Sequence, residues 1–243
     1  MHTTDLNELS GDYEHVFVSP HLDDAVLSCG GAIATYVQQG ARVLVVTLCT
    51  AVPEAEQFGP LAEEFRGDWS LSQEEAVTAR LREDLAAMHV VGCDSLWAGL
   101  LDSIYRLPFG YDTREKLFGR PDPADPLFGQ LREYFTALRT RLPQATWYVP
   151  LGVGFHVDHQ VVFTVAREVF GEGLAYYEDV YYVIEPGELE RRMADLNEPM
   201  TPSVIDIGDA LPRKIEAIDC YASQVPELFG GSQAMAQAIT GYA

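Results

Sequence analysis

The chain has 243 residues, of which 47% are hydrophobic and 22% are charged, and this composition excludes a disordered chain. Its 37 acidic residues against 16 lysines and arginines give a formal net charge of −21, which repels nucleic-acid backbones and anionic lipid headgroups. We therefore expect no nucleic-acid partner and a neutral or cationic small molecule as the ligand. An acidic surface also keeps a protein soluble, so the charge alone does not identify that ligand.

The cysteines and the N-terminus indicate where the protein resides. The four cysteines form no C-x-x-C pair, which argues against a thiolate zinc site and against a redox motif. The polar, acidic N-terminus lacks the basic and apolar regions of a signal peptide, and no apolar run has the length of a membrane span. We expect a cytoplasmic protein without a membrane span, whose cysteines are free thiols.

The N-terminal half alternates between strand-like and helix-like patterns. The apolar run over 15–19 predicts a buried strand, the helical spacing over 25–39 predicts a helix that stops before Gly40, and the β-branched run over 42–48 predicts a second strand. A strand, a helix and a strand with short links form a βαβ unit. Its two strands should therefore run parallel.

The alternation continues after an acidic, proline-containing loop over 51–69. Ser72 and the acids that follow it are typical of a helix N-terminus, and this helix should run to about Met88. A third strand is predicted over 95–100. The long aromatic and proline-rich segment 105–126 is typical of a functional loop.

The same patterns predict the remaining elements: a helix over 127–142, strands over 146–150 and 174–184, helices over 159–170 and 188–196, an edge strand over 204–207 and a last helix over 211–221. This alternation predicts an α/β sandwich with a mainly parallel sheet. The length suits a single domain over 1–243.

Two clusters of polar residues follow predicted strands. The first contains His21, Asp23 and Asp24, and the second contains His156, Asp158 and His159. Ligands of open α/β sheets bind beyond the carboxyl ends of the strands, so we expect both clusters at one edge of the sheet.

The residue types in these clusters suit a metal site. Imidazole and carboxylate together bind zinc or another first-row divalent ion, and a catalytic zinc has three protein ligands and an open position. His21, Asp24 and His159 would form such a ligand set. Asp23, adjacent to a ligand, could then act as the base for the attacking water.

Each cluster also has a structural interpretation. Asp24 could simply cap the next helix, and Asp158 could lie in the first turn of another. The presence of both clusters at strand ends favours the metal site. Gly152 and Gly154 form only a fragment of the G-x-G-x-x-G signature, so a nucleotide-binding enzyme is a weak alternative.

The two motifs SPHLDDAVLSCGGAI and GFHVDH together resemble the PIG-L/LmbE-like family of zinc-dependent N-acetylglucosaminyl de-N-acetylases. Their order and separation agree with the family, and weaker similarity continues over 177–179 and 214–224. The resemblance implies a Rossmann-like three-layer sandwich. It also implies zinc-dependent removal of an N-acetyl group from an N-acetylglucosamine-type amino sugar in a small-molecule conjugate.

The resemblance further implies roles for individual residues. The zinc ligands would be His21, Asp24 and His159, and the general base would be Asp23. His156 would stabilise the oxyanion or protonate the leaving amine. Asp158 would orient a histidine through a hydrogen bond, as metal sites usually require.

Two further residues are implied to bind the substrate, Arg80 on the helix after Ser72 and Asp102 after the third strand. Arg80 could equally be a solvated helix charge near Glu83 and Asp84.

The chain departs from the family pattern at Gly154, where some members carry a tyrosine that assists the oxyanion. Either His156 and zinc act without it, or a tyrosine such as Tyr105 or Tyr111 enters from the long loop.

The motifs define the chemistry but leave the acceptor and the oligomeric state open. The same metal site could hydrolyse another amide or an imidate, and a non-catalytic sugar-binding protein is a further alternative. Because no membrane segment is recognised, antibiotic biosynthesis or a similar small-molecule pathway fits better than glycolipid metabolism.

Overall fold

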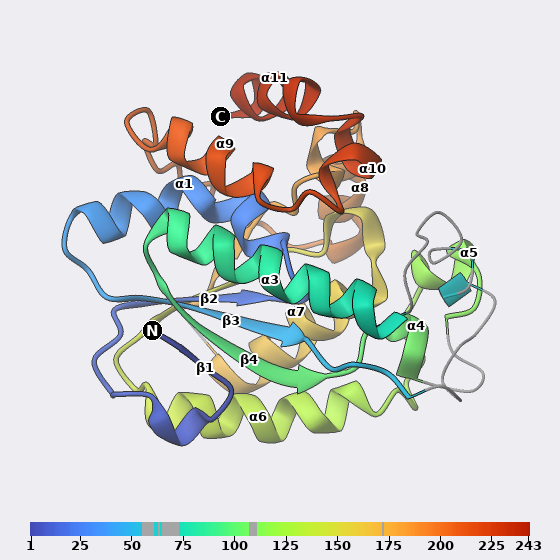
Figure 1. The fold of residues 1–243 in the computed structure, drawn as a ribbon. Coiled ribbons are helices and arrows are strands. Elements are labelled where there is room, and N and C mark those ends of the chain that lie inside the picture. The colour runs from blue at the N-terminus through green and yellow to red at the C-terminus, as the bar shows by residue number, and fades with distance from the viewer. Residues whose placement is uncertain (55–60, 63, 65–72, 107–110, 172) are drawn as a thin grey trace.

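The computed structural model describes residues 1–54, 61–62, 64, 73–106, 111–171 and 173–243. They form a three-layer sandwich with one sheet between two layers of helices (Figure 1). The six strands follow the order β1-β4-β3-β2-β5-β6, and every neighbouring pair is parallel. The Rossmann-like α/β sandwich expected from the sequence is confirmed.

The strands are β1 (His2–Thr3), β2 (His15–Ser19), β3 (Val43–Cys49), β4 (Asp94–Leu100), β5 (Thr146–Pro150) and β6 (Ala175–Tyr177). Helices cover both faces of the sheet, so the central strands are apolar on both sides rather than alternating. Every residue of β3 is buried, for example. Four predicted strands, β2 to β5, lie within a residue of their expected bounds, and the two-residue β1 was not predicted.

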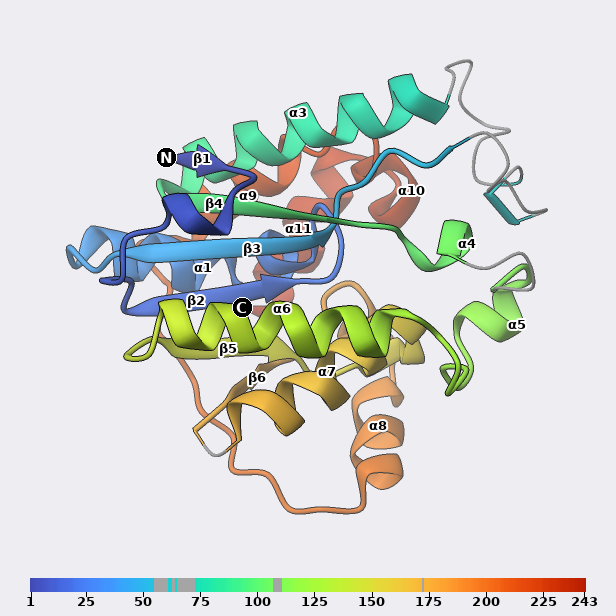
Figure 2. The same cartoon turned by 90° about the horizontal axis from the view of Figure 1, so that it is seen from below.

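Helices α1 (Asp24–Gln38), α3 (Gln73–Val91) and α9 (Leu211–Asp219) cover one face of the sheet, and α6 (Leu127–Arg141) and α7 (Val157–Phe170) cover the other (Figures 1 and 2). From β2 the chain builds outward through β3 to β4, then crosses back to β5 on the other side of β2. The strand order therefore reverses between β2 and β5. Such a switch point is where open α/β sheets bind ligands.

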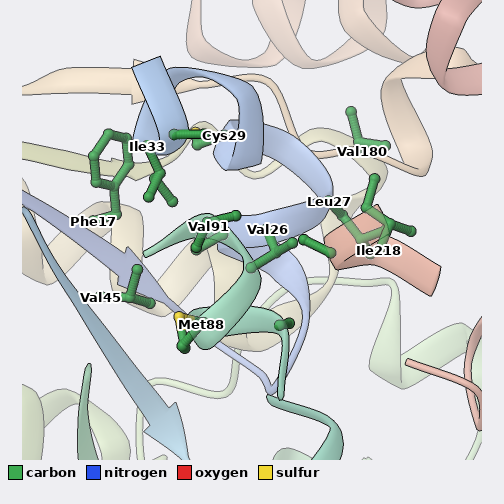
Figure 3. Packing of buried hydrophobic residues seen from close by; sticks show 14 of the residues in the cluster. Phe17, Val26, Leu27, Cys29, Ile33, Val45, Met88, Val91, Val180 and Ile218 are labelled. Atoms are coloured by element: carbon green, nitrogen blue, oxygen red, sulfur yellow. The ribbon is translucent and has the colours of Figure 1, made fainter. Parts of the chain in front are cut away.

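The core on the α1 side forms because inward residues of three helices meet the sheet. Phe17 of β2, Ile33 of α1, Met88 of α3 and Ile218 of α9 belong to one buried cluster (Figure 3). On the opposite face, α6 and α7 bury a second cluster that includes Phe135. The helical spacing seen in the sequence thus marks the faces that are buried.

The predicted strand over 174–184 is wrong beyond Tyr177. The chain leaves the sheet after β6, and a 3-10 helix occupies Tyr182–Ile184. The reason is Asp179, whose carboxylate accepts hydrogen bonds from the backbone of the β5–α7 connection and so draws the chain across the strand ends.

The C-terminal predictions also need correction. No strand forms over 204–207 among the described residues; Val204 is 93% exposed, while Ile207 packs against Gly31 of α1. The helix predicted over 211–221 ends at Asp219 and is not the last. The helices α10 (Val225–Phe229) and α11 (Ser232–Tyr242) follow it, and α8 (Glu188–Leu196) occurs as predicted.

The long segment after β4 contains two short helices, α4 (Ser103–Arg106) and α5 (Arg114–Leu117). Both lie beyond the arrowheads of the central strands (Figure 2). The predicted N-cap Ser72 and most of the predicted loop over 51–69 lie outside the described residues. Among the helices described, none combines the length and apolar character that a membrane crossing needs.

Truncation of Phe135 tests the α6–α7 core. Phe135 is fully buried, and its ring lies 5.2 Å from that of Phe170. Phe135→Ala should lower the free energy of unfolding by about 3–5 kcal/mol, measured by urea denaturation. Glu133→Ala, on the exposed face of the same helix, should stay within about 0.5 kcal/mol of the parent. Equal urea midpoints for both variants would contradict this packing.

Candidate active site

The first cluster lies in a tight turn between β2 and α1. The Ser19 hydroxyl donates to the carbonyl of His21 (2.7 Å) and accepts from the backbone N–H of Ala25 (3.0 Å). The backbone N–H of His21 donates to Asp24 Oδ2 (2.8 Å). Asp23 is the N-cap of α1, yet its carboxylate makes no capping hydrogen bond. The turn is held by its neighbours, and Asp23 lines a cavity instead.

The second cluster lies at the start of α7. His156 is the N-cap of this helix, and its Nδ1 accepts the backbone N–H of Asp158 (3.3 Å). The structural interpretation of this cluster is therefore also realised, because His156 caps the helix and Asp158 lies in its first turn. Since β2 and β5 are adjacent, the two clusters meet: His21 Nε2 donates to Asp158 Oδ2 at 3.0 Å.

The predicted ligand residues converge on one carboxylate oxygen. Asp24 Oδ2 lies 3.2 Å from His21 Nδ1 and 3.3 Å from His159 Nε2. Ligand atoms of a tetrahedral ion with bonds of 2.0–2.1 Å lie about 3.3 Å apart. The donor types suit a divalent ion, and each of these two nitrogen–oxygen separations is close to that value.

Other donor combinations occur in the same place. One ring nitrogen from each of His21, His156 and His159 lies within 4.8 Å of the others, and the same limit holds for His21, Cys49 and Asp158. Burial raises the pKa of the Cys49 thiol well above its usual value, so this cysteine is a poor thiolate donor. His156 is therefore the main competitor of Asp24 for a place in the ligand set.

The carboxylates control the charge of the imidazoles. Burial opposes the charged form of His21, but Asp102, Asp158 and Asp24 outweigh it and raise its pKa well above the usual value. Burial likewise opposes a charged His159, and Asp24 together with Asp179 raises its pKa to about 10. The site thus attracts positive charge to the two predicted histidine ligands.

His156 behaves in the opposite way. Burial and the nearby His21 lower the pKa of His156 well below its usual value. It is therefore a neutral imidazole at physiological pH. Because its Nδ1 accepts a hydrogen bond, the ring proton resides on Nε2, which makes Nε2 a donor.

The two adjacent aspartates titrate differently. Burial and the charge of Asp24 raise the pKa of Asp23 to about 6, against the effect of Arg80. Burial would raise the pKa of Asp24 as well, but His159 and His21 lower it well below its usual range. Asp24 stays ionised, as a ligand must, while Asp23 has the near-neutral pKa that suits a general base.

Arg80 faces the cavity rather than solvent. Its guanidinium lies 3.8 Å from Asp23 Oδ2, and its buried Nε has no hydrogen-bond partner among the described residues. Glu83 instead bonds Ser223, and Asp84 bonds Trp97 and Tyr221. The neighbouring acids of α3 are thus engaged elsewhere, which disfavours the interpretation of Arg80 as a solvated helix charge.

Asp158 is held by a buried network. Arg106 donates two hydrogen bonds to Asp125, at 3.0 and 2.7 Å. The same guanidinium forms an ion pair with Asp158, with a nitrogen 2.5 Å from Oδ1 but without the alignment of a hydrogen bond. The backbone N–H of Ser103 donates to Asp158 Oδ2 (3.1 Å). Burial alone would raise the pKa of Asp158, but Arg106 and His21 lower it well below its usual value. An ionised Asp158 thus orients His21.

Asp179 supports the other histidine. Its Oδ1 accepts from His159 Nδ1 at 2.6 Å, and its Oδ2 accepts the backbone N–H groups of Gly152 (2.7 Å) and Val153 (2.9 Å). One carboxylate thus orients the His159 ring and fixes the backbone that follows β5.

His21, Asp23, Asp24, Arg80 and His156 line a cavity of about 390 Å³. Asp102, predicted to bind substrate, lines it with one oxygen 3.6 Å from His21 Nε2. The rest of the wall is mixed, with apolar Val77, Leu117, Phe118 and Leu228 beside polar Arg80, Gln224 and Glu227. The cavity can accept a molecule with both polar and apolar parts.

The tyrosines proposed from the long loop lie in different surroundings. The Tyr111 hydroxyl donates to Asp125 (2.8 Å) and accepts from the backbone of Asp122 (3.0 Å), so it supports the Arg106 network and does not line the cavity. Tyr105 does line the cavity. So does Tyr182, which reasoning from the sequence placed inside a strand.

The sequence patterns also missed two supporting residues. Arg106 gave no signal because nothing in an isolated chain ties it to Asp158, some 50 residues away. Asp179 belonged to the weakly family-like Tyr177-Glu178-Asp179 segment, which was the available hint of its role.

Comparison with known proteins agrees with this geometry. Residues 16–170 match the sequence model of the PIG-L family, described as GlcNAc-PI de-N-acetylase. The chain is 29% identical over 184 residues to a 2′-N-acetylparomamine deacetylase of Niallia circulans, covering 69% of this chain and 66% of that relative. It is 27% identical over 250 residues to a 1D-myo-inositol 2-acetamido-2-deoxy-alpha-D-glucopyranoside deacetylase of Mycobacterium sp. (strain KMS), covering 86% and 73%.

Among solved structures, the zinc-inhibited form of teicoplanin deacetylase Orf2 matches with a TM-score of 0.75 at 25% identity, covering 95% of this chain and 91% of that one. Fold and site define an α/β protein with a histidine–aspartate centre at its switch point. The family match spans well over half of the chain, which therefore belongs to the PIG-L family. Its named relatives are deacetylases, and this supports deacetylase activity.

Loss of Arg106 tests the buried network. Arg106→Met leaves Asp125 and Asp158 without their cation and should lower the free energy of unfolding by about 3–5 kcal/mol in urea denaturation. The exposed Arg132 pairs with Glu168 on the surface, and Arg132→Met should cost no more than about 1 kcal/mol. The network would have no structural role if the two variants unfolded at the same urea concentration.

Proposed function

We propose that this protein is a zinc-dependent hydrolase that removes the N-acetyl group from an N-acetylglucosamine-type amino sugar in a small-molecule conjugate. The observation that carries the proposal is that ring nitrogens of His21 and His159 lie 3.2 and 3.3 Å from Asp24 Oδ2. Beside them, the carboxylate of Asp23 makes no cap hydrogen bond and lines the cavity. The relatives support the acetamide reaction, because the two curated relatives and the solved structure described above are named as deacetylases.

The metal would be held by His21, Asp24 and His159. When bound, zinc would polarise the acetamide carbonyl and lower the pKa of the attacking water. Asp158 orients His21 and Asp179 orients His159, so both imidazoles are held with one ring nitrogen toward Asp24. Supporting hydrogen bonds of this kind are typical of histidines that bind metals.

Residues of the site that are not metal ligands would transfer the protons. Asp23 takes the proton of the attacking water at its carboxylate, for which a pKa of about 6 is well matched. His156, neutral and with its proton on Nε2, donates a hydrogen bond from Nε2 to the amide oxygen. The proton that Asp23 has taken from the water passes to the leaving amine. Arg80 and Asp102 lie in the same cavity and would bind the hydroxyls of the sugar. Acetate and a free amine are the products.

The first test removes the base. With a panel of N-acetylated amino sugars and measured acetate release, Asp23→Asn should lower kcat by about 10²–10⁴-fold, because the amide cannot accept the water proton. Its bound metal, measured by atomic absorption, should be unchanged. Asp209→Asn changes an exposed aspartate outside the site and should keep full activity. Full activity in Asp23→Asn would remove Asp23 from the mechanism.

A second test separates the two possible ligand sets. His159→Ala should lower zinc affinity by about 100-fold or more, measured by competition with a chelator, because it removes a ligand. His156→Ala should bind zinc as tightly as the parent but turn over slowly. Loss of zinc binding in His156→Ala, with binding retained in Asp24→Asn, would replace the proposed set by the three histidines.

A further inference from the structure

The backbone at Gly154 leaves a gap that another side chain fills. Gly154 lies in the 3-10 helix Val153–Phe155 with φ +81°, and a Cβ built there would meet Tyr182 Cγ at 2.3 Å and Cβ at 2.7 Å. The Tyr182 ring therefore occupies the volume into which any side chain at position 154 would point. A glycine is needed here both for the positive φ and for the close approach of this ring.

Two anchors hold Tyr182 in this place. The backbone N–H of Val180 donates to Ser28 Oγ of α1 (3.1 Å), and the N–H of Val183 donates to the carbonyl of Asp179 (3.0 Å). The carboxylate of Asp179 in turn binds the backbone next to Gly154. The segments that carry Tyr182 and Gly154 are therefore tied to one residue, so their contact is built into the fold.

The Tyr182 side chain belongs to the reaction cavity. It lines the cavity together with Asp23, Asp24 and His156, and its ring meets that of His159 edge to face at 6.0 Å between centroids. Among the described residues, none forms a hydrogen bond with its hydroxyl. A phenol with an ordinary pKa of about 10 is protonated at neutral pH, so the hydroxyl can donate a hydrogen bond.

We propose that Tyr182 is a catalytic residue whose phenol hydroxyl donates a hydrogen bond to the oxygen of the scissile amide as negative charge develops on it. The inference rests on the proposed amide hydrolysis. A donor of this kind acts more strongly on the transition state than on the substrate, because the charge it meets appears only then. Tyr182, in the segment after β6, would share this task with His156 at the start of α7.

The test keeps the ring and removes the hydroxyl. Tyr182→Phe still fills the gap at Gly154, so it should fold and bind zinc as the parent does. With an amino sugar that the parent deacetylates, its kcat should fall by about 100-fold and its KM should change by less than about twofold. Tyr176→Phe is the matched control, a half-buried tyrosine packed on Phe163 outside the cavity, and it should keep full kcat. Unchanged kcat in Tyr182→Phe would overturn the inference, and the Tyr182 ring would then only fill space beside Gly154.

A second measurement does not depend on turnover. Methylphosphonate is a tetrahedral anion that resembles the charged intermediate, and its Kd for the zinc-loaded protein can be measured by calorimetry. Tyr182→Phe should bind it about tenfold more weakly than the parent, and Tyr176→Phe should bind it equally well. Equal affinity in Tyr182→Phe, or no binding by the parent, would overturn the inference. If the parent binds the anion but releases no acetate from any sugar, the proposed function is contradicted instead. The Kd values of the parent and of Tyr182→Phe for methylphosphonate then still decide whether the Tyr182 hydroxyl contacts the anion.

Discussion

Buried negative charge at the switch point of the sheet is the constraint on which the rest of the site depends. Four aspartates there, Asp23, Asp24, Asp158 and Asp179, are at most 7% exposed. Buried carboxylates are tolerated only where cations and hydrogen-bond donors compensate them. The protein meets this need with Arg106, backbone N–H groups and imidazoles. The groups that stabilise the fold at this edge are the same groups that orient the candidate ligands.

The negative charges of these four carboxylates are not compensated equally, and this difference separates the roles of the four aspartates. Asp158 is held by the Arg106 guanidinium and the backbone N–H of Ser103, and Asp179 is held by two backbone N–H groups and His159. Asp24 has two imidazoles and the backbone N–H of His21 as partners. Asp23 makes no cap hydrogen bond, and among the described residues its ion pair is the longer one to Arg80, at 3.8 Å. A proton-transfer group must change its charge easily, whereas a support must not. The least compensated carboxylate is therefore the one best suited to accept a proton.

Much of this architecture could be predicted from local patterns. The central strands and α1, α6 and α7 follow apolar periodicity, and the parallel order of β2 and β5 follows from the βαβ alternation. The site residues were also within reach, because they directly follow strands whose carboxyl ends must share an edge. These features depend on short stretches of chain and on a rule that holds for all parallel sheets.

The rest depended on long-range contacts. The run 174–184 is rich in aromatic and β-branched residues, which favour a strand, but the hydrogen bonds of Asp179 to the β5–α7 backbone override that preference. The roles of Arg106 and Tyr182 have the same origin, since their partners are remote in sequence. Nor could the close approach of the Tyr182 ring to Gly154 be recognised from the sequence, because the two lie in different segments.

The C-terminal helices have a consequence for the limits of the folding unit. The family match ends at residue 170, yet Ile218 of α9 and Ile239 of α11 are fully buried in the same core as α1. Lys214 reaches the carbonyl of Ser28 in the helix that begins with Asp24. A chain that ended at residue 170 would expose to solvent the residues of α1 that belong to the same buried cluster as Ile218 and Ile239. The part of the chain that matches the family model is thus not a portable module, and any chimera built from it must carry helices α9, α10 and α11 as well.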